Sequence, residues 1–188
     1  GSEDQKRAYL PKCASGKLTV AVAHTESDPC QDLTRIQTTA KKNGKKFQIS
    51  GEKQYISNAD KADMLLVAAR NENFAAEDQA LNFFCVKRKT SGVTVEPIKK
   101  LGYKGVNFCR VSIDAAEVGE KDILGGPDKL VGGEQQWQQI LDIALLAVTS
   151  EAVGLAQGVF DYTLDYARQR VQFGQAIGKF NVIRNMLA

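Results

Sequence analysis

The spacing of hydrophobic residues divides the chain into a β region and an α region. Over residues 17–124 apolar and polar positions alternate, as around Val20, which predicts half-buried strands. From about residue 133 onward, apolar residues recur three or four positions apart, which predicts amphipathic helices. Residues 2–12 are polar and helix-permissive, with Ser2 as a cap, and are interpreted as the end of a helix.

Turn and strand signals within the β region indicate many short strands. Asn43-Gly44 is the strongest hairpin signal, because both residues tolerate a positive φ. The continuous apolar run 64–69 suits a strand buried on both faces, and glycines and Pro97 punctuate the stretches that follow. Regularly spaced short strands are typical of a barrel or a sandwich. The whole pattern predicts an α+β protein with more than one domain.

The α region is apolar, but its longest uninterrupted apolar run, 143–148, is far shorter than the ~20 residues that span a bilayer. We therefore expect a soluble protein without a transmembrane segment. Gly154 and Gly158 lie four residues apart, and small residues at this spacing let helices pack closely. The sequence Gly-Gly-Pro at 125–127 is expected to link strands to helices, and a second helix is expected after Gly178.

Composition narrows the functional classes. The chain has 188 residues, of which 43% are hydrophobic and 25% charged, and a net charge of +3, which is too small to indicate a nucleic-acid partner. The four cysteines lack C-x-x-C spacing and only one histidine accompanies them, so we expect no metal site. The polar start does not resemble a signal peptide. Reduced thiols in the cytoplasm or the mitochondrial matrix are expected.

Common nucleotide-binding and hydrolytic motifs are absent from the sequence. It contains neither G-x-G-x-x-G after a strand nor G-x-x-x-x-G-K-[ST]. His24 is the only histidine, and no Ser-His-Asp arrangement accompanies it. Two interpretations of His24 are open: it acts as a base, or it is a packed or hydrogen-bonded residue at the end of a strand.

Four stretches, taken in order, resemble the acyl-CoA dehydrogenases. Each is short, but together they cover nearly the whole chain. They are GSEDQKRAYLPK with ASG after it; AHTE, TTA, ISGEK and YISN; LGYKG with VSID; and AVGLA, YAR, RVQFG and the final MLA.

The resemblance implies three parts. Residues 1–16 would end an N-terminal helical domain, 17–128 would form an antiparallel β-barrel middle domain, and 129–188 would begin an up-down helical bundle. The family reaction removes an α-proton from an acyl-CoA thioester and moves a β-hydride to N5 of FAD, and an electron-transfer acceptor reoxidises the flavin. Family members are usually homodimers or homotetramers with FAD at a subunit interface.

The resemblance also implies residues that hold the flavin ring. The Thr25 hydroxyl and the backbone amides from Val22 to Thr25, with His24 among them, match the segment that lines the pyrimidine side of the ring. The triplet 55–57 matches a family triplet that contacts the flavin. By this match Tyr55 packs on the ring, Ile56 follows it, and Ser57 forms a hydrogen bond near N5. The family more often has Trp at the first position and Thr at the third. Strand alternation puts residues 55 and 57 on the same face. The alternative is a pair of ordinary strand residues.

A later segment matches the residues that reach FAD from a neighbouring subunit. Arg170 matches the arginine that binds the pyrophosphate, a task that suits its forked guanidinium. Gln172 and Phe173 match the cofactor-contacting residues beside it. The alternative for Arg170 is a solvated residue at a helix end.

Substrate contacts depart from the family pattern. The family often has E-P-G-x-G-S-D where this chain has ESDPCQD, so Gln31 replaces a serine on the substrate side. Asp142 matches an aspartate that some members use on the pantetheine, or else it interrupts an apolar helix face. Leu145 stands where an arginine is usual.

The resemblance places no catalytic base within these residues. Most members use a glutamate beyond the matched region, and a minority use the position that is Ala144 here, which cannot accept a proton. We therefore expect a dehydrogenase fragment that is inactive alone. The alternatives are a non-catalytic family member that serves as an assembly or binding module, and a related acyl-CoA oxidase or desulfinase.

Overall fold

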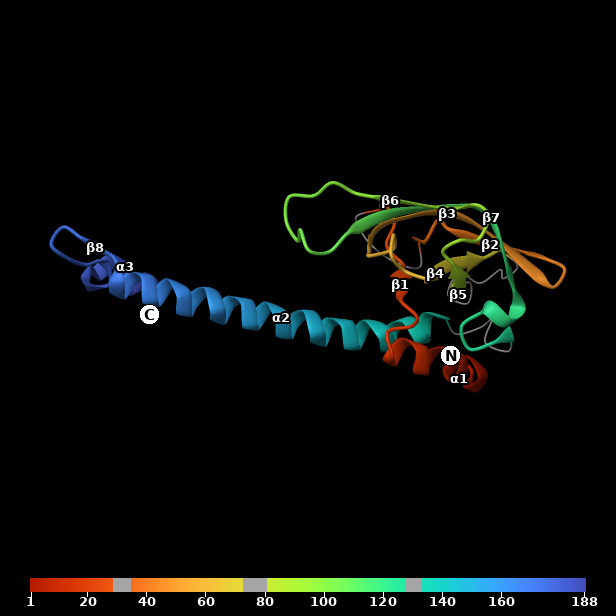
Figure 1. The fold of residues 1–188 in the computed structure, drawn as a ribbon, viewed down its shortest axis with the longest axis horizontal. Helices are drawn as coiled ribbons and strands as arrows, with labels where there is room; N and C mark the ends of the chain where they lie inside the picture. Colours follow the sequence, from red (N-terminus) through yellow and green to blue (C-terminus); the bar gives the residue numbers. More distant parts are fainter. Residues whose placement is uncertain (29–34, 73–80, 128–132) are drawn as a thin grey trace. The chain divides into compact units, whose positions relative to one another are not determined.

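The computed structural model describes residues 1–28, 35–72, 81–127 and 133–188. It divides into two compact units, residues 1–137 and 138–188. The first unit holds the sheet and the N-terminal helix (Figure 1). The second holds most of one long helix, a small hairpin and a short helix.

One seven-stranded sheet organises the first unit, in the order β1-β4-β2-β3-β7-β6, with β5 paired to β4. Hairpins and long antiparallel ladders join β2 to β3, β3 to β7 and β7 to β6. The strands are β1 (Val20–Ala23), β2 (Thr39–Asn43), β3 (Lys46–Ser57), β4 (Met64–Asn71), β5 (Leu81–Lys87), β6 (Val93–Pro97) and β7 (Phe108–Gly119).

The expected antiparallel barrel is wrong in its strand directions, because the sheet is mixed and open. β1 and β2 both run parallel to β4, at the registers Val20↔Met64 and Thr39↔Arg70, so they share one edge of that strand end to end. β5 occupies the other edge in antiparallel fashion. β4 is buried on both faces for most of its length, as the apolar run predicted, and such strands favour a central place. Apolar alternation predicts strands but does not fix their direction.

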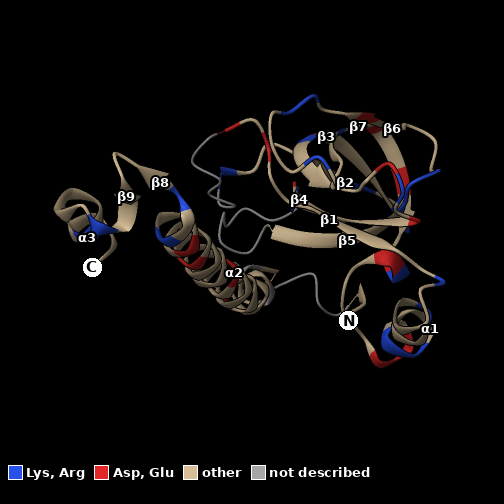
Figure 2. Cartoon of the chain, turned by 60° about the vertical axis from the view of Figure 1, so that its left-hand side comes forward, with Lys and Arg blue, Asp and Glu red and all other residues tan. Residues whose placement is uncertain are grey.

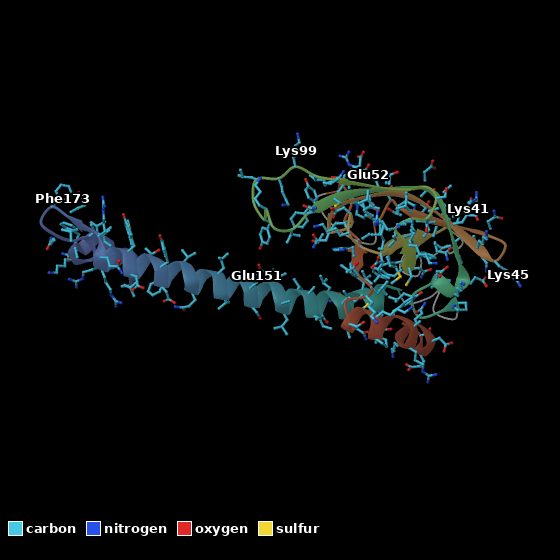
Figure 3. The ribbon with its side chains drawn as sticks, in the orientation of Figure 1. Lys41, Lys45, Glu52, Lys99, Glu151 and Phe173 are labelled. Carbon is cyan, nitrogen blue, oxygen red and sulfur yellow. The ribbon has the colours of Figure 1, made fainter. Side chains whose placement is uncertain are left out.

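The predicted hairpin joins β2 to β3, one position later than the sequence signal suggested. Asn43 pairs with Lys46, so the two turn residues are Gly44 and Lys45. Gly44 has a φ of +61°, which supplies the one positive φ that a turn of this kind needs at its first position. Figure 3 labels Lys45 at this turn and Lys41 on β2.

The core of the first unit lies against the β3, β4 and β7 strands. Its largest fully buried apolar side chains include Phe47, Phe83 and Phe84, and the rings of Phe47 and Phe84 lie 5.4 Å apart. Inward positions of β3 and β7 alternate with exposed ones, which is the pattern of a sheet packed on one face. Burial of these aromatic side chains, together with the aliphatic residues around them, stabilises the fold.

The N-terminal helix α1 (Glu3–Ala14) begins at a capping box. Ser2 Oγ accepts a hydrogen bond from the Gln5 amide, and Gln5 Oε1 accepts one from the Ser2 amide. The buried Gln5 amide group also donates to the carbonyls of Lys121 and Ile123, at 3.0 and 2.7 Å. The same side chain therefore starts the helix and attaches it to η3 (Glu120–Asp122) and the residue after it.

The second unit contains the greater part of α2 (Gly133–Gln169), followed by β8 (Val171–Gln172), β9 (Gln175–Ala176), η5 (Ile177–Lys179) and α3 (Asn181–Leu187). The predicted helix after Gly178 corresponds to α3. Phe173 and Gly174, with φ values of +51° and +80°, form the turn of the β8–β9 hairpin.

The apolar character of α2 is stronger than the sequence run suggested. Among the described residues, the stretch Trp137–Gln169 is long and apolar enough to cross a membrane by length and composition. Figure 2 shows few charged positions along this helix, whereas blue and red segments are interspersed over the first unit. Polar residues such as Gln138 and Thr149 interrupt the apolar positions, which is why no long uninterrupted run exists. Helices that pack in the core of a protein meet the same two criteria.

The backbone at Gly51 leads to a stability prediction. Its φ is +152°, and a Cβ placed there would lie 2.5 Å from Thr38 Oγ1 and 2.7 Å from Thr38 Cα. We expect Gly51→Ala to lower the free energy of unfolding by about 1–3 kcal/mol, because β3 must move away from Thr38. Gly102→Ala, where a Cβ would meet no atom within 4 Å, is the matched control. Equal urea midpoints for the two variants would contradict this close approach.

Candidate functional site

A cavity of about 750 Å³ opens between β1 and the end of β3. This volume lies within the range of about 300–1,000 Å³ that small-molecule and cofactor sites occupy. Four of the predicted site residues line it together, namely Val22, His24, Tyr55 and Ser57. The remaining lining residues are Thr19, Val20, Ala21, Asn58, Lys61, Ala62 and Gly105.

A β-bulge directs the end of β3 toward this cavity. Lys53 pairs with Val111 but Ile56 pairs with Cys109, so two residues of β3 oppose one residue of β7. Tyr55, within the bulge, has a φ of +58°. The extra residue reverses the alternation of the strand. Lys53 is buried on the inner face, yet Tyr55, two residues later, is 60% exposed.

The bulge separates the three residues of the predicted triplet. Tyr55 and Ser57 both line the cavity, while the side chain of Ile56 is 1% exposed and belongs to the hydrophobic core. The side chain of Ile56 therefore points away from the cavity. Strand alternation predicted that residues 55 and 57 share a face, but it could not predict which face.

Thr25 holds the bulge from the end of β1. Its hydroxyl donates to the carbonyl of Gln54, and its own carbonyl accepts from the Gln54 amide at 2.9 Å. The proton of this hydroxyl is thus engaged within the protein, and its remaining lone pairs can only accept. Thr25 connects the two segments that form the cavity wall.

A buried ion pair lies next to this connection. Lys53 Nζ lies 2.8 Å from Glu26 Oε1, with the lysine side chain fully buried and the glutamate side chain 11% exposed. Glu26 also accepts from the Gln37 amide at 2.7 Å, and from the amide and hydroxyl of Thr38 at 2.9 and 2.5 Å. Four donors therefore surround one carboxylate, as the burial of such a charge requires.

Burial and pairing shift the ionisation of both partners. Burial lowers the pKa of Lys53 to about 8, against the opposing effect of the Glu26 charge. Burial alone would raise the pKa of Glu26, but the hydrogen bond and charge of Lys53, with the Thr38 and Gln37 donors, bring that pKa below its ordinary value. At neutral pH the pair is therefore ionised.

His24 occupies the cavity wall beside Trp137. The two ring centroids lie 4.7 Å apart, so His24 packs against an aromatic ring, as one of its two interpretations expected. Burial lowers the pKa of His24 despite an opposing interaction with the Val22 backbone, and the charge of Lys53 lowers it further. Its buried Nδ1 has no hydrogen-bond partner among the described residues. A neutral imidazole with an unsatisfied nitrogen is a ready partner for a polar ligand.

The backbone of β1 offers a second set of polar groups. Within the described sheet, β1 pairs with β4 alone. An edge strand leaves a row of amide and carbonyl groups without ladder partners. Val20 and Val22, which line the cavity, are 39% and 38% exposed. The wall therefore combines apolar side chains with polar backbone, a mixture that suits a flat heteroaromatic ring.

The second unit carries the three residues predicted to contact FAD from a neighbouring subunit. Arg170 directly follows α2, its amide donates to the Tyr166 carbonyl, and its carbonyl accepts from Ile177. Gln172 ends β8, and Phe173 is 91% exposed at the hairpin turn, as Figure 3 shows. The Phe173 ring contacts Phe180 edge-on at 6.3 Å. The hairpin thus brings all three residues together on one small element.

The predicted substrate residues lie apart from this hairpin in the sequence. Asp142 is exposed on α2 and accepts a hydrogen bond from Gln138 one turn earlier, at 2.8 Å. Leu145 is 54% exposed on the same helix. Gln31 lies outside the described residues.

Sequence reasoning missed the most buried part of this site. Lys53 and Glu26 belong to the matched stretches ISGEK and AHTE, but neither was predicted to be a site residue. One signal was available, because Phe47 and Ile49 set an inward alternation in which Lys53 also falls. A lysine at an inward position requires a buried partner, since a lone buried charge is costly.

The chain belongs to the acyl-CoA dehydrogenase family. The family models for the acyl-CoA dehydrogenase middle domain and C-terminal domain match residues 21–116 and 132–188. Similar relatives include an acyl-CoA dehydrogenase of Bacillus subtilis, 35% identical over 94% of this chain and 46% of the relative. The mitochondrial isovaleryl-CoA dehydrogenase of Pongo abelii is 32% identical over 100% of this chain and 44% of the relative.

Solved structures show the same fold. An acyl-CoA dehydrogenase from Geobacillus kaustophilus is 30% identical and superposes with a TM-score of 0.92 over 100% of this chain and 49% of the other. The chain therefore spans somewhat less than half the length of the relatives it matches.

The buried ion pair predicts a specific acid sensitivity. Because the folded-state pKa of Glu26 is below its ordinary value of 4.5, its stabilising contribution is complete above that pH and is lost as the pH falls through the folded pKa. We expect the thermal midpoint of wild type to exceed that of Glu26→Gln at neutral pH, and the difference to shrink below pH 4.5. Differential scanning fluorimetry from neutral to acidic pH measures both midpoints.

The control for this measurement is Glu117→Gln. Glu117 pairs with Lys46 at 2.7 Å, but both side chains are exposed, and such pairs contribute about 0–1 kcal/mol. We expect its midpoint to stay near wild type throughout. A Glu26→Gln difference that persists unchanged in acid would show that the amide change, and not the charge, destabilises the protein.

Proposed function

We propose that this chain forms the flavin-binding part of an FAD-dependent acyl-CoA dehydrogenase. The observation that carries the proposal is the cavity in which β1 and the bulged end of β3 bring Val22, His24, Tyr55 and Ser57 together. Residues from two strands far apart in sequence thus converge on one space. Family membership supplies the chemistry that this space would serve, since acyl-CoA dehydrogenases are FAD-dependent.

The cavity residues fit an isoalloxazine ring. The unpaired edge of β1 offers amides to the polar pyrimidine side, and the exposed Tyr55 ring offers a stacking surface. The Ser57 hydroxyl can donate to a ring nitrogen, and the unsatisfied Nδ1 of His24 provides one more polar contact. When bound, the flavin accepts the hydride from the β-carbon of the acyl group. The protein residues orient the ring and exclude water from it.

The diphosphate of FAD would be held by the hairpin of the second unit. Arg170 has the forked guanidinium that pairs with two phosphate oxygens, and Gln172 and Phe173 stand beside it. In this proposal the hairpin serves the FAD of another copy, so the protein would be a homodimer or homotetramer. Asp142 would contact the pantetheine of an acyl-CoA substrate, and Gln31 would border it. An electron-transfer acceptor would reoxidise the flavin.

In this proposal, residues 1–16 are the end of an N-terminal helical domain and residues 17–128 form the β domain. Residues 129–188 would begin an up-down bundle, and the remaining apolar surface of α2 would pack against its other helices. Relatives from mitochondria and from bacteria are consistent with a soluble protein of the cytoplasm or the mitochondrial matrix.

Ser57 and Tyr55 provide the test of the flavin site. We expect Ser57→Ala to weaken FAD binding about two- to tenfold, because one neutral hydrogen bond contributes about 0.5–1.5 kcal/mol. Tyr55→Ala should weaken it further, since it removes the aromatic surface beside the ring. Fluorescence titration of FAD into the flavin-free protein, at its natural full length, measures both dissociation constants.

The matched control for Ser57 is Ser91→Ala, in an exposed turn between β5 and β6. Its FAD affinity should equal that of wild type. Unchanged affinity in both Ser57→Ala and Tyr55→Ala would place the flavin elsewhere and remove the proposal.

The position of Ala144 leads to a prediction about turnover. No residue matched here to the family base can accept a proton, so the 188-residue chain should not oxidise a saturated acyl-CoA when FAD and an artificial electron acceptor are supplied. Dye reduction at the rate of a protein-free blank is expected. Turnover above that blank would require a base among these residues and would overturn the match at Ala144.

A further inference from the structure

We infer that Lys53, through its ion pair with Glu26, is a positioning residue for the flavin cavity: the pair holds the β3 bulge that turns Tyr55 and Ser57 outward. This inference rests on the proposed function for its ligand, but its structural content is independent of it. Lys53 does not line the cavity, so it would act through its neighbours and not by contact.

The first step is the geometry of the bulge. Lys53 is the last residue of β3 that pairs with β7 before the bulge, at Val111, and Ile56 is the first that resumes pairing, at Cys109. An uninterrupted strand would place residues 55 and 57 on the same inner face as Lys53. The bulge is therefore the feature that gives the cavity its aromatic ring and its hydroxyl.

The second step is the anchoring of both sides of the bulge. Before it, the ammonium group of Lys53 is fixed to Glu26. Within it, the Gln54 amide donates to the Thr25 carbonyl, and the Gln54 carbonyl accepts from the Thr25 hydroxyl. Thr25 and Glu26 are consecutive, so a single short segment after β1 holds two consecutive residues of β3. Because β1 itself forms the opposite wall, this double connection sets the separation of the two walls.

The third step is the rigidity of the anchor. Glu26 accepts four hydrogen bonds, and two of them come from Thr38, whose carbonyl in turn accepts from Arg70 on β4 at 2.8 Å. Gly51, two residues before Lys53, allows β3 to approach Thr38 closely. Three of these donors meet Glu26 Oε1 and one meets Oε2, and neither Glu26 nor Lys53 lines the cavity, which favours positioning over binding.

A second lysine of the same strand gives a matched comparison. Lys46 also forms an ion pair, with Glu117 at 2.7 Å, but its side chain is 61% exposed and it lies at the far end of β3. Removing either ammonium group deletes one charge and one ion pair from β3. Only the loss at Lys53 would disturb the bulge.

The experiment compares Lys53→Met, Lys53→Arg, Lys46→Met and the double variant Lys53→Met/Glu26→Gln in the full-length protein. Hydrogen exchange of the flavin-free proteins reports on the segment 54–58, and fluorescence titration reports the FAD dissociation constant. We expect Lys53→Met to accelerate exchange in that segment and to weaken FAD binding about tenfold or more, where tenfold corresponds to about 1.4 kcal/mol. Lys46→Met should change neither, and Lys53→Arg should retain part of the affinity.

The double variant separates positioning from stability. With both charges removed, no ion remains buried without a partner, so its thermal midpoint should recover relative to Lys53→Met. Its FAD affinity and the absorption spectrum of its bound flavin should remain altered, because the anchor of the bulge is still missing. Recovery of affinity and spectrum together with the midpoint would show a merely structural role and overturn the inference.

Failure of the proposed function gives a different result. If wild type and Lys46→Met both bind no FAD, the flavin assignment is wrong, whatever Lys53 does. The exchange measurement still decides the inference in that case. Exchange over 54–58 that is equal in Lys53→Met and Lys46→Met would show that the pair does not hold the bulge.

Discussion

The structure of this site depends on one charge that has been removed from water. A lysine ammonium on the inner face of a β-strand is unfavourable unless a carboxylate and further donors compensate it. Here the carboxylate of Glu26 comes from the segment after β1, and its other donors come from the residues before β2. The ion pair therefore connects three segments, namely β3, the residues after β1 and the residues before β2. It adds side-chain contacts to the backbone ladders that already align these strands.

The anchor of the bulge also meets the parallel edge of β4. β1 and β2 share that edge end to end in parallel register. Glu26 follows β1, Thr38 precedes β2, and the two residues hydrogen-bond to each other. The residues that hold the β3 bulge therefore also join the neighbouring ends of β1 and β2.

The sequence predicted the periodic parts of the fold and could not predict its irregular parts. Alternation predicted β3 and β7, the apolar run predicted β4, and the glycine at position 44 predicted the hairpin. Strand direction and the bulge at Tyr55 depend on contacts between residues far apart in sequence. The spacing of apolar residues along the chain carries no information about such contacts. The resemblance named the cavity residues as a set, and Val22, His24, Tyr55 and Ser57 lie together. It could not name Lys53, whose role exists only once the bulge is known. The longest uninterrupted apolar run did not indicate how apolar α2 is as a whole, because polar residues interrupt its apolar positions.

The two groups of residues predicted to contact FAD belong to different compact units of the chain. The cavity belongs wholly to the first compact unit, while Arg170, Gln172 and Phe173 lie on a hairpin of the second. An aromatic side chain that is 91% exposed at the turn of such a hairpin contributes little hydrophobic stabilisation to a lone chain. Exposed aromatic side chains beside an arginine are typical of interface contacts. The long apolar surface of α2 also requires a covering, and the match to the C-terminal domain model includes this helix. A site completed by a second copy would use both features at once: one copy orients the ring, and the other holds the phosphates.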